Sequence, residues 1–141
     1  MNTWRLALLP LAVIVGALVV YVRPGDTGEK KVDNRVFELR IYYANPGKME
    51  ALHARFKNHT NKLLEKHGMT LIGFWTDEKE PQRKLLYLVA HKSKEAAQAS
   101  WKAFGADPDW KAAKAESEKG GVLVEKVDVV WLNPTEYSAL K

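Results

Sequence analysis

The chain has 141 residues, a formal net charge of +5 and no cysteine. This length allows one ordinary domain, and the lack of cysteine excludes disulfide scaffolds, thiolate zinc sites and cysteine nucleophiles. Hydrophobic residues make up 46% of the chain, which excludes a globally disordered protein.

The first predicted element is an uncharged apolar stretch at residues 6–22. A helix over this stretch would rise about 26 Å, close to the hydrocarbon core of about 30 Å. Trp4 and Tyr21 flank it, as interfacial aromatics flank membrane anchors. The alternative is a signal peptide cleaved after Ala17, which would leave an apolar new terminus. Residues 1–22 are therefore predicted to be a membrane anchor or a signal segment. The protein is then membrane-anchored by its N-terminus, or secreted or periplasmic if the segment is cleaved.

A polar segment with one proline and two glycines follows at residues 23–35 and is typical of a linker. The folded domain is predicted at residues 36–137. Residues 36–141 carry 17 basic and 14 acidic side chains, and the two signs alternate along the chain. The domain shows no basic stripe, so nucleic-acid binding is not expected.

The domain begins with an alternating strand at residues 36–43. Asn45 as N-cap and Pro46 as first residue then predict a helix that runs to His67, with Gly68 just beyond its end. The later elements are strands at 69–76 and 83–91, a helix capped by Ser93 and ended by Gly105, a short helix capped by Asp107, and a strand at 122–132. The order β-α-β-β-α-β predicts an α+β, ferredoxin-like fold with a four-stranded antiparallel sheet, preceded by the N-terminal apolar helix.

Alternation along the strands predicts which sheet face the helices cover. The face expected to meet the helices carries Phe37, Leu39, Ile41, Ile72, Phe74, Leu86, Leu88, Val127, Val129 and Trp131. The open face is expected to carry Glu38, Arg40, Tyr42, Gly73, Trp75, Tyr87, Val89, His91, Lys126 and Asp128. Such an open face is too apolar to prefer water alone, which favours a homodimer whose two sheets enclose a partly polar cavity.

Several motifs occur in a characteristic order along this domain. They are Glu38-Leu39-Arg40 with Tyr42, Pro46-Gly47, His59-Thr60, His67-Gly68-Met69, Gly73 with Trp75, Trp101 with Phe104, and Asp107-Pro108 with Trp110. The ordered set resembles the NIPSNAP family over nearly all of residues 36–137. The resemblance implies a dimeric α+β barrel, a superfamily that also holds cofactor-free monooxygenases and haem-degrading enzymes. NIPSNAP relatives are tied to mitochondria, vesicle traffic and mitophagy signalling.

The apolar N-terminus departs from the Arg-rich amphipathic transit peptide that a mitochondrial role requires. We therefore expect a bacterial version of the family that is exported or membrane-tethered. Its function is predicted to be that of a small-molecule-binding or interaction domain. One alternative is a cofactor-independent monooxygenase or haem-degrading-type enzyme that uses the barrel cavity, and another is a membrane-tethered protein adaptor.

The four histidines do not form a metal-binding pattern. His53, His59 and His67 share the first helix at separations of 6 and 8 residues, whereas helical metal pairs need a spacing of three or four. We expect no metal and no cofactor. His91, at the end of a strand on the predicted open face, is the candidate general base, and the alternative is a structurally satisfied histidine.

Glu38 and Arg40 lie two residues apart and therefore share one face of their strand. They are expected to bind a polar ligand group or to form structural ion pairs. The expected ligand is small and apolar or aromatic. The predicted ligand-binding residues are Glu38, Arg40, Tyr42, Trp75, Tyr87, His91 and His59. Helical spacing places Trp101, Phe104 and Trp110 in the core or the dimer interface.

Overall fold

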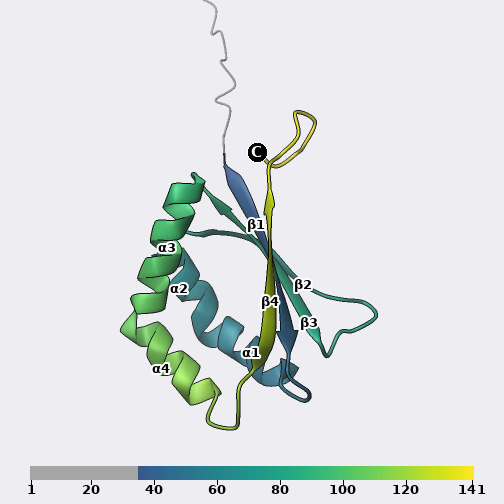
Figure 1. Ribbon diagram of the computed structural model, residues 1–141, viewed down its shortest axis with the longest axis vertical. Helices are drawn as coiled ribbons and strands as arrows, with labels where there is room; N and C mark the ends of the chain where they lie inside the picture. The colour runs from purple at the N-terminus through teal and green to yellow at the C-terminus, as the bar shows by residue number, and fades with distance from the viewer. Residues whose placement is uncertain (1–34) are drawn as a thin grey trace, which may run out of the picture. The chain divides into compact units, whose positions relative to one another are not determined.

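The computed structural model describes residues 35–141, so the predicted apolar helix and nearly all of the predicted linker lie outside the described residues. The described chain forms a four-stranded antiparallel sheet in the order β2-β3-β1-β4, with the helices on one of its faces (Figure 1). The predicted α+β, ferredoxin-like arrangement is therefore confirmed. The elements are β1 (Val36–Ala44), α1 (Met49–Arg55), the π-helix η1 (Phe56–Thr60), α2 (Asn61–Lys66), β2 (Thr70–Thr76), β3 (Lys84–His91), α3 (Lys94–Ala106), α4 (Pro108–Ser117) and β4 (Val124–Leu132).

One helix was expected from Pro46 to His67 with Asn45 as its N-cap, but the helix begins only at Met49. Asn45 is not its cap, because its side-chain Nδ2 donates to the backbone oxygen of Val122, 2.9 Å away, and so holds the turn before β4. The chain instead turns at Gly47, which has a φ of +72°. Gly68, with a φ of +81°, ends the helical segment as predicted.

A π-helical turn, η1, interrupts this helical segment. The backbone N–H of Asn61 donates to the carbonyl of Phe56, five residues earlier, and the Thr60 hydroxyl donates to the Arg55 carbonyl at 3.3 Å. π-turns are rare and are frequently found at functional sites. The turn keeps Phe56 and Thr60 buried against the sheet, and it sets the direction of Asn61, the next residue.

The caps of the later helices follow the sequence closely. The Ser93 hydroxyl accepts a hydrogen bond from the Ala96 N–H at 3.1 Å, and Asp107 caps α4 from just before Pro108. Asp107 also pairs with Lys66 at 2.8 Å and with His67 at 2.7 Å, which ties α2 to α4. These two partners hold the pKa of the Asp107 carboxyl well below its ordinary value.

Among the described residues, no helix is long and apolar enough to cross a membrane.

The predicted sheet faces are reversed on β1 and β3. Strand pairing joins Arg40 to Tyr87 and Leu39 to Leu88, and Tyr87 is fully buried in the core beneath the helices. In the structure, the face that the helices cover carries Glu38, Arg40, Tyr42, Tyr87, Val89 and His91. The open face carries Phe37, Leu39, Ile41, Leu86 and Leu88. Alternation alone does not identify the inner face here, because both sets contain large apolar side chains.

The prediction for β4 is correct. Val127 and Val129 pair with Tyr42 and Arg40, and so they share the face that the helices occupy. Val129 and Trp131 nevertheless remain 43% and 38% exposed. The edge strand β4 therefore extends beyond the cover of its own helices.

Strand β2 contains a bulge between Leu71 and Gly73, which makes Ile72 the additional residue instead of the expected inward one. Leu71 and Phe74 pack against the core. Trp75 points to the open face as predicted. Its indole lies across Gly73 so closely that a Cβ on Gly73 would come within 2.5 Å of the ring.

The open face of the sheet carries large apolar side chains, as the core face does, together with the Lys126–Asp128 ion pair. The core consists mainly of Met49, Leu52, Phe56, Leu63, Leu64, Met69, Leu85, Tyr87, Val89 and Phe104, with Trp101 and Trp110 packed against it. This confirms the predicted packing role of Trp101, Phe104 and Trp110. The open face presents Leu39, Ile41, Trp75, Leu86, Leu88, Val130 and Leu132. A face of this kind usually marks an interaction surface.

Candidate functional site

Glu38 is the centre of a buried polar cluster between β1, β3 and α3. Its carboxylate is almost inaccessible to solvent and accepts hydrogen bonds from Trp101 Nε1 at 2.6 Å and His91 Nε2 at 3.0 Å. Arg40 Nε lies 3.6 Å from the other carboxylate oxygen. Burial raises the pKa of Glu38, but the hydrogen bonds from His91 and Trp101 and the charge of Arg40 outweigh it, and the pKa is lowered. The carboxylate is therefore ionised at neutral pH.

Two nitrogen atoms of this cluster are buried without a hydrogen-bond partner: His91 Nδ1 and Arg40 Nε. The Arg40 guanidinium lies 4.0 Å from the centre of the Trp101 ring, a cation–π arrangement. With Nε2 donating to Glu38, neutral His91 keeps Nδ1 as a bare acceptor. The cluster thus pairs an imidazole with a carboxylate that orients it, but His91 is buried and does not line the cleft described below.

Tyr42 and Tyr87 lie beside this cluster on the same sheet face. The Tyr87 hydroxyl donates to the Tyr42 hydroxyl at 3.1 Å. Burial, followed by the neighbouring Tyr42, raises the pKa of Tyr87 well above its ordinary value, so the phenol stays protonated. Tyr87 also stacks on Phe74, with ring centres 5.5 Å apart. These tyrosines link the Glu38 cluster to a cleft on the other side of Phe74.

The structure brings together five of the predicted site residues, Glu38, Arg40, Tyr42, Tyr87 and His91. It does not bring Trp75 or His59 to them. Trp75 lies on the opposite sheet face, and His59 lines a groove between the π-helix and α4 together with Asp109 and Glu116. The predicted ligand-binding residues Arg40, Tyr42 and His91 therefore do not share a cavity with Trp75 within the described chain.

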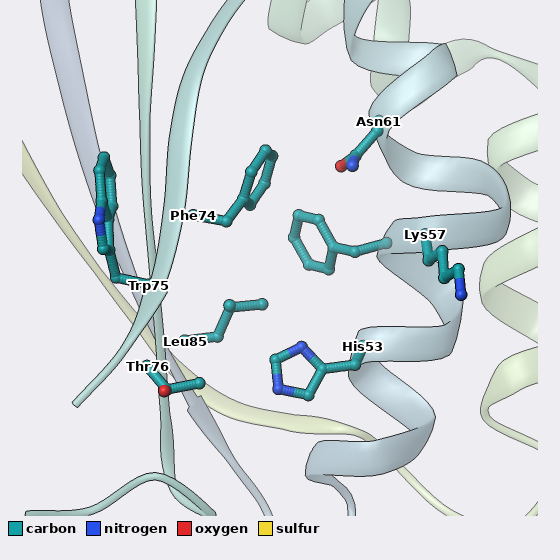
Figure 2. A pocket seen from close by; sticks show the side chains of 8 residues that line it. His53, Lys57, Asn61, Phe74, Trp75, Thr76 and Leu85 are labelled. Atoms are coloured by element: carbon teal, nitrogen blue, oxygen red, sulfur yellow. The ribbon is translucent and has the colours of Figure 1, made fainter. Parts of the chain in front are cut away.

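A cleft of about 440 Å³ lies between the first helical segment and the edge of the sheet (Figure 2). Figure 2 shows His53 and Asn61 on the helical side directed toward Phe74 and Leu85 on the strands, whereas the Trp75 ring points away behind β2. Phe56 and Phe74 meet edge to face, with ring centres 5.8 Å apart. The cleft is lined by His53, Phe56, Lys57, Asn61, Phe74, Trp75, Thr76 and Leu85.

Asn61 supplies an unusual polar group to this cleft. Its Oδ1 atom is buried and has no hydrogen-bond partner. Buried polar atoms of this kind are rare and call for an explanation such as a bound molecule. The ionisable side chains in the lining, His53 and Lys57, are both basic.

Sequence reasoning missed the cleft because its position depends on the π-turn and on the β2 bulge. Neither irregularity has a clear signature in the sequence, and both change which side chains face each other. The one indication in the sequence is the polar Thr60-Asn61 pair on the side of the helix that carries Phe56, Leu63 and Leu64. Within the described residues, no group of three or more His, Asp or Glu side chains is arranged to hold a metal ion.

The sequence of the folded domain matches the model of a known protein family. The NIPSNAP model matches residues 37–139, which is most of the chain. The chain belongs to the NIPSNAP family. No curated protein is detectably similar to it in sequence.

Solved structures agree with this NIPSNAP assignment. A NIPSNAP family protein of unknown function from Agrobacterium tumefaciens is 19% identical, with a TM-score of 0.68 over 78% of this chain and 96% of that chain. A second A. tumefaciens NIPSNAP protein is 22% identical, with a TM-score of 0.67 over 76% and 99%. A candidate antibiotic biosynthesis monooxygenase from Chloroflexus aurantiacus is 18% identical, with a TM-score of 0.51 over 76% and 99%. At these identities the likeness concerns the fold alone.

Proposed function

We propose that this NIPSNAP protein is a homodimeric α+β barrel that binds a small molecule in the cleft between the π-helix and β2. The observation that carries the proposal is the cleft itself. Its volume of about 440 Å³ is within the range of ligand pockets, and its walls combine Phe56 and Phe74 with the polar Asn61. Residues 6–22 anchor the protein to a membrane or direct its export in this proposal.

The dimer is supported by the uncovered parts of the sheet. The open face is apolar, and the free edge of β4 carries exposed Val129 and Trp131 on one side and exposed Val130 and Leu132 on the other. A long apolar edge strand without cover favours association or aggregation. Pairing with a second copy removes this surface from water, and a domain of this size gains core volume from it.

Native mass spectrometry of the protein purified from the cells that express it is expected to report two chains with a retained small molecule. The substitution His53→Trp places a bulky ring at the cleft mouth, and we expect it to abolish the retained mass while the dimer persists. His59→Trp is the matched control, because His59 is also exposed but lines the groove beside α4. Retention of the ligand by His53→Trp, or a wild-type dimer without ligand, would contradict the proposal.

A cofactor-independent monooxygenase is the second candidate function. It is supported by the Glu38-oriented His91, whose free Nδ1 can accept a proton, and by the likeness to the Chloroflexus protein. Such an enzyme converts a substrate CH₂ group and O₂ into a carbonyl group and water, so the substrate supplies all four electrons that reduce O₂ and no external reductant is needed. Ligand-dependent O₂ uptake distinguishes this candidate from simple binding. The adaptor alternative has less support, because the domain contains a cleft.

A further inference from the structure

We infer that the ligand of this cleft is a hydroxylated aromatic acid, whose hydroxyl donates a hydrogen bond to Asn61 Oδ1. The inference rests on the proposed binding function and adds the chemical class of the ligand. It depends on three features of the cleft, which are its unpaired acceptor, its aromatic walls and the sign of its charge.

The acceptor is held in place by the backbone. The Asn61 N–H is bonded to the Phe56 carbonyl in the π-turn, which fixes the backbone from which the side-chain amide projects. Its Oδ1 faces the cleft interior without a donor, as Figure 2 shows for the labelled side chain. A buried acceptor without a donor destabilises the unliganded protein, and a ligand O–H or N–H removes that cost.

The walls around this acceptor favour an aromatic ring. Phe56 and Phe74 make edge-to-face contact with each other, and both pack on Tyr87. A further ring can join this arrangement by stacking or by edge-to-face contact. A hydroxyl group on the ligand ring is then the hydrogen-bond donor nearest to Asn61 Oδ1.

The charge of the lining selects the rest of the ligand. His53 and Lys57 are the ionisable lining residues, and both are exposed near the mouth. The Lys57 side chain points away from the strands in Figure 2, but no acidic residue of the described chain lines the cleft, and the His53 imidazole is directed into it and can donate a hydrogen bond to a ligand carboxylate. The donor at the inner end is therefore a neutral hydroxyl instead of a charged amine.

Titration calorimetry on the full-length protein in a mild detergent tests this inference with 4-hydroxybenzoate, benzoate and phenol. We expect 4-hydroxybenzoate to bind at least tenfold more tightly than benzoate, which lacks the donor, and than phenol, which lacks the carboxylate. Asn61→Leu should bind 4-hydroxybenzoate and benzoate equally, and Asn61→Ala should do the same. Asn58→Leu is the matched control, because Asn58 lies on the same π-turn but lines the opposite groove.

Stability provides a second readout. Because Asn61 Oδ1 makes no hydrogen bond, Asn61→Leu should melt at the wild-type temperature or above it. A lower melting temperature, or an undiminished preference for 4-hydroxybenzoate in Asn61→Leu, would overturn the inference. If none of the three probes binds the wild-type protein, the ligand class is wrong, and the His53→Trp comparison decides separately whether the cleft binds another molecule.

Discussion

Replacing Glu38 by alanine is expected to lower the free energy of unfolding by about 3–5 kcal/mol, the usual cost of removing one partner from a buried ionic network. Glu38 is 2% exposed and is the acceptor for both Trp101 and His91. Without it, these two donors and the Arg40 guanidinium stay buried with no carboxylate. Urea unfolding at pH 7 measures the loss.

The Glu38→Gln variant isolates the contribution of the charge. The pKa of Glu38 in the folded protein is below its ordinary value of 4.5. The carboxylate therefore stabilises the fold fully above about pH 4.5, and this contribution is lost as the pH falls through the lower folded pKa. Wild-type stability should decline over this acidic range more steeply than that of Glu38→Gln.

Glu65→Ala is the control for both variants. Glu65 lies exposed on α2 at a distance in sequence from the cluster, and the change should alter the unfolding free energy by less than about 0.5 kcal/mol. If Glu38→Ala were no more destabilising than Glu65→Ala, the hydrogen bonds of Trp101 and His91 to Glu38 would have no energetic role.

The sequence was sufficient for the order of elements and for most of the caps. Ser93, Asp107 and Gly68 act as local signals, because each one satisfies or redirects the backbone of its own helix end. Asn45 shows the limit of such signals. Its side chain donates a hydrogen bond to the Val122 carbonyl, 77 positions later in the chain, and no local sequence pattern indicates that contact.

The sheet faces could not be predicted for a related reason. Period-two alternation separates Glu38, Arg40 and His91 from Leu39 and Ile41, but it does not say which set the helices cover. The usual rule that polar residues face outward fails because the Glu38 carboxylate finds its hydrogen-bond donors inside the fold, at His91 and at Trp101 of α3. The grouping of the site residues on one face was thus predictable, while the identity of that face was not.

Loss of the dimer is the largest effect that we expect from an open-face substitution. Val130 is on this face, opposite Leu39, and is 42% exposed in the single chain. In a two-fold dimer, Val130→Glu brings two carboxylates into an apolar interface, where their desolvation and repulsion cost several kcal/mol. The dissociation constant of the dimer should rise on the order of 1,000-fold, so that light scattering reports a single chain at micromolar concentration.

Val122→Glu is the matched control, because Val122 is also exposed, at 57%, but lies in the turn before β4 instead of on the open face. Circular dichroism should show the same folded spectrum for both variants, since neither side chain belongs to the core. A Val130→Glu protein that remained dimeric would show that the open face is not the interface. The exposed apolar edge of β4 would then have to be covered in another way, and the barrel would no longer explain why both sides of this strand are apolar.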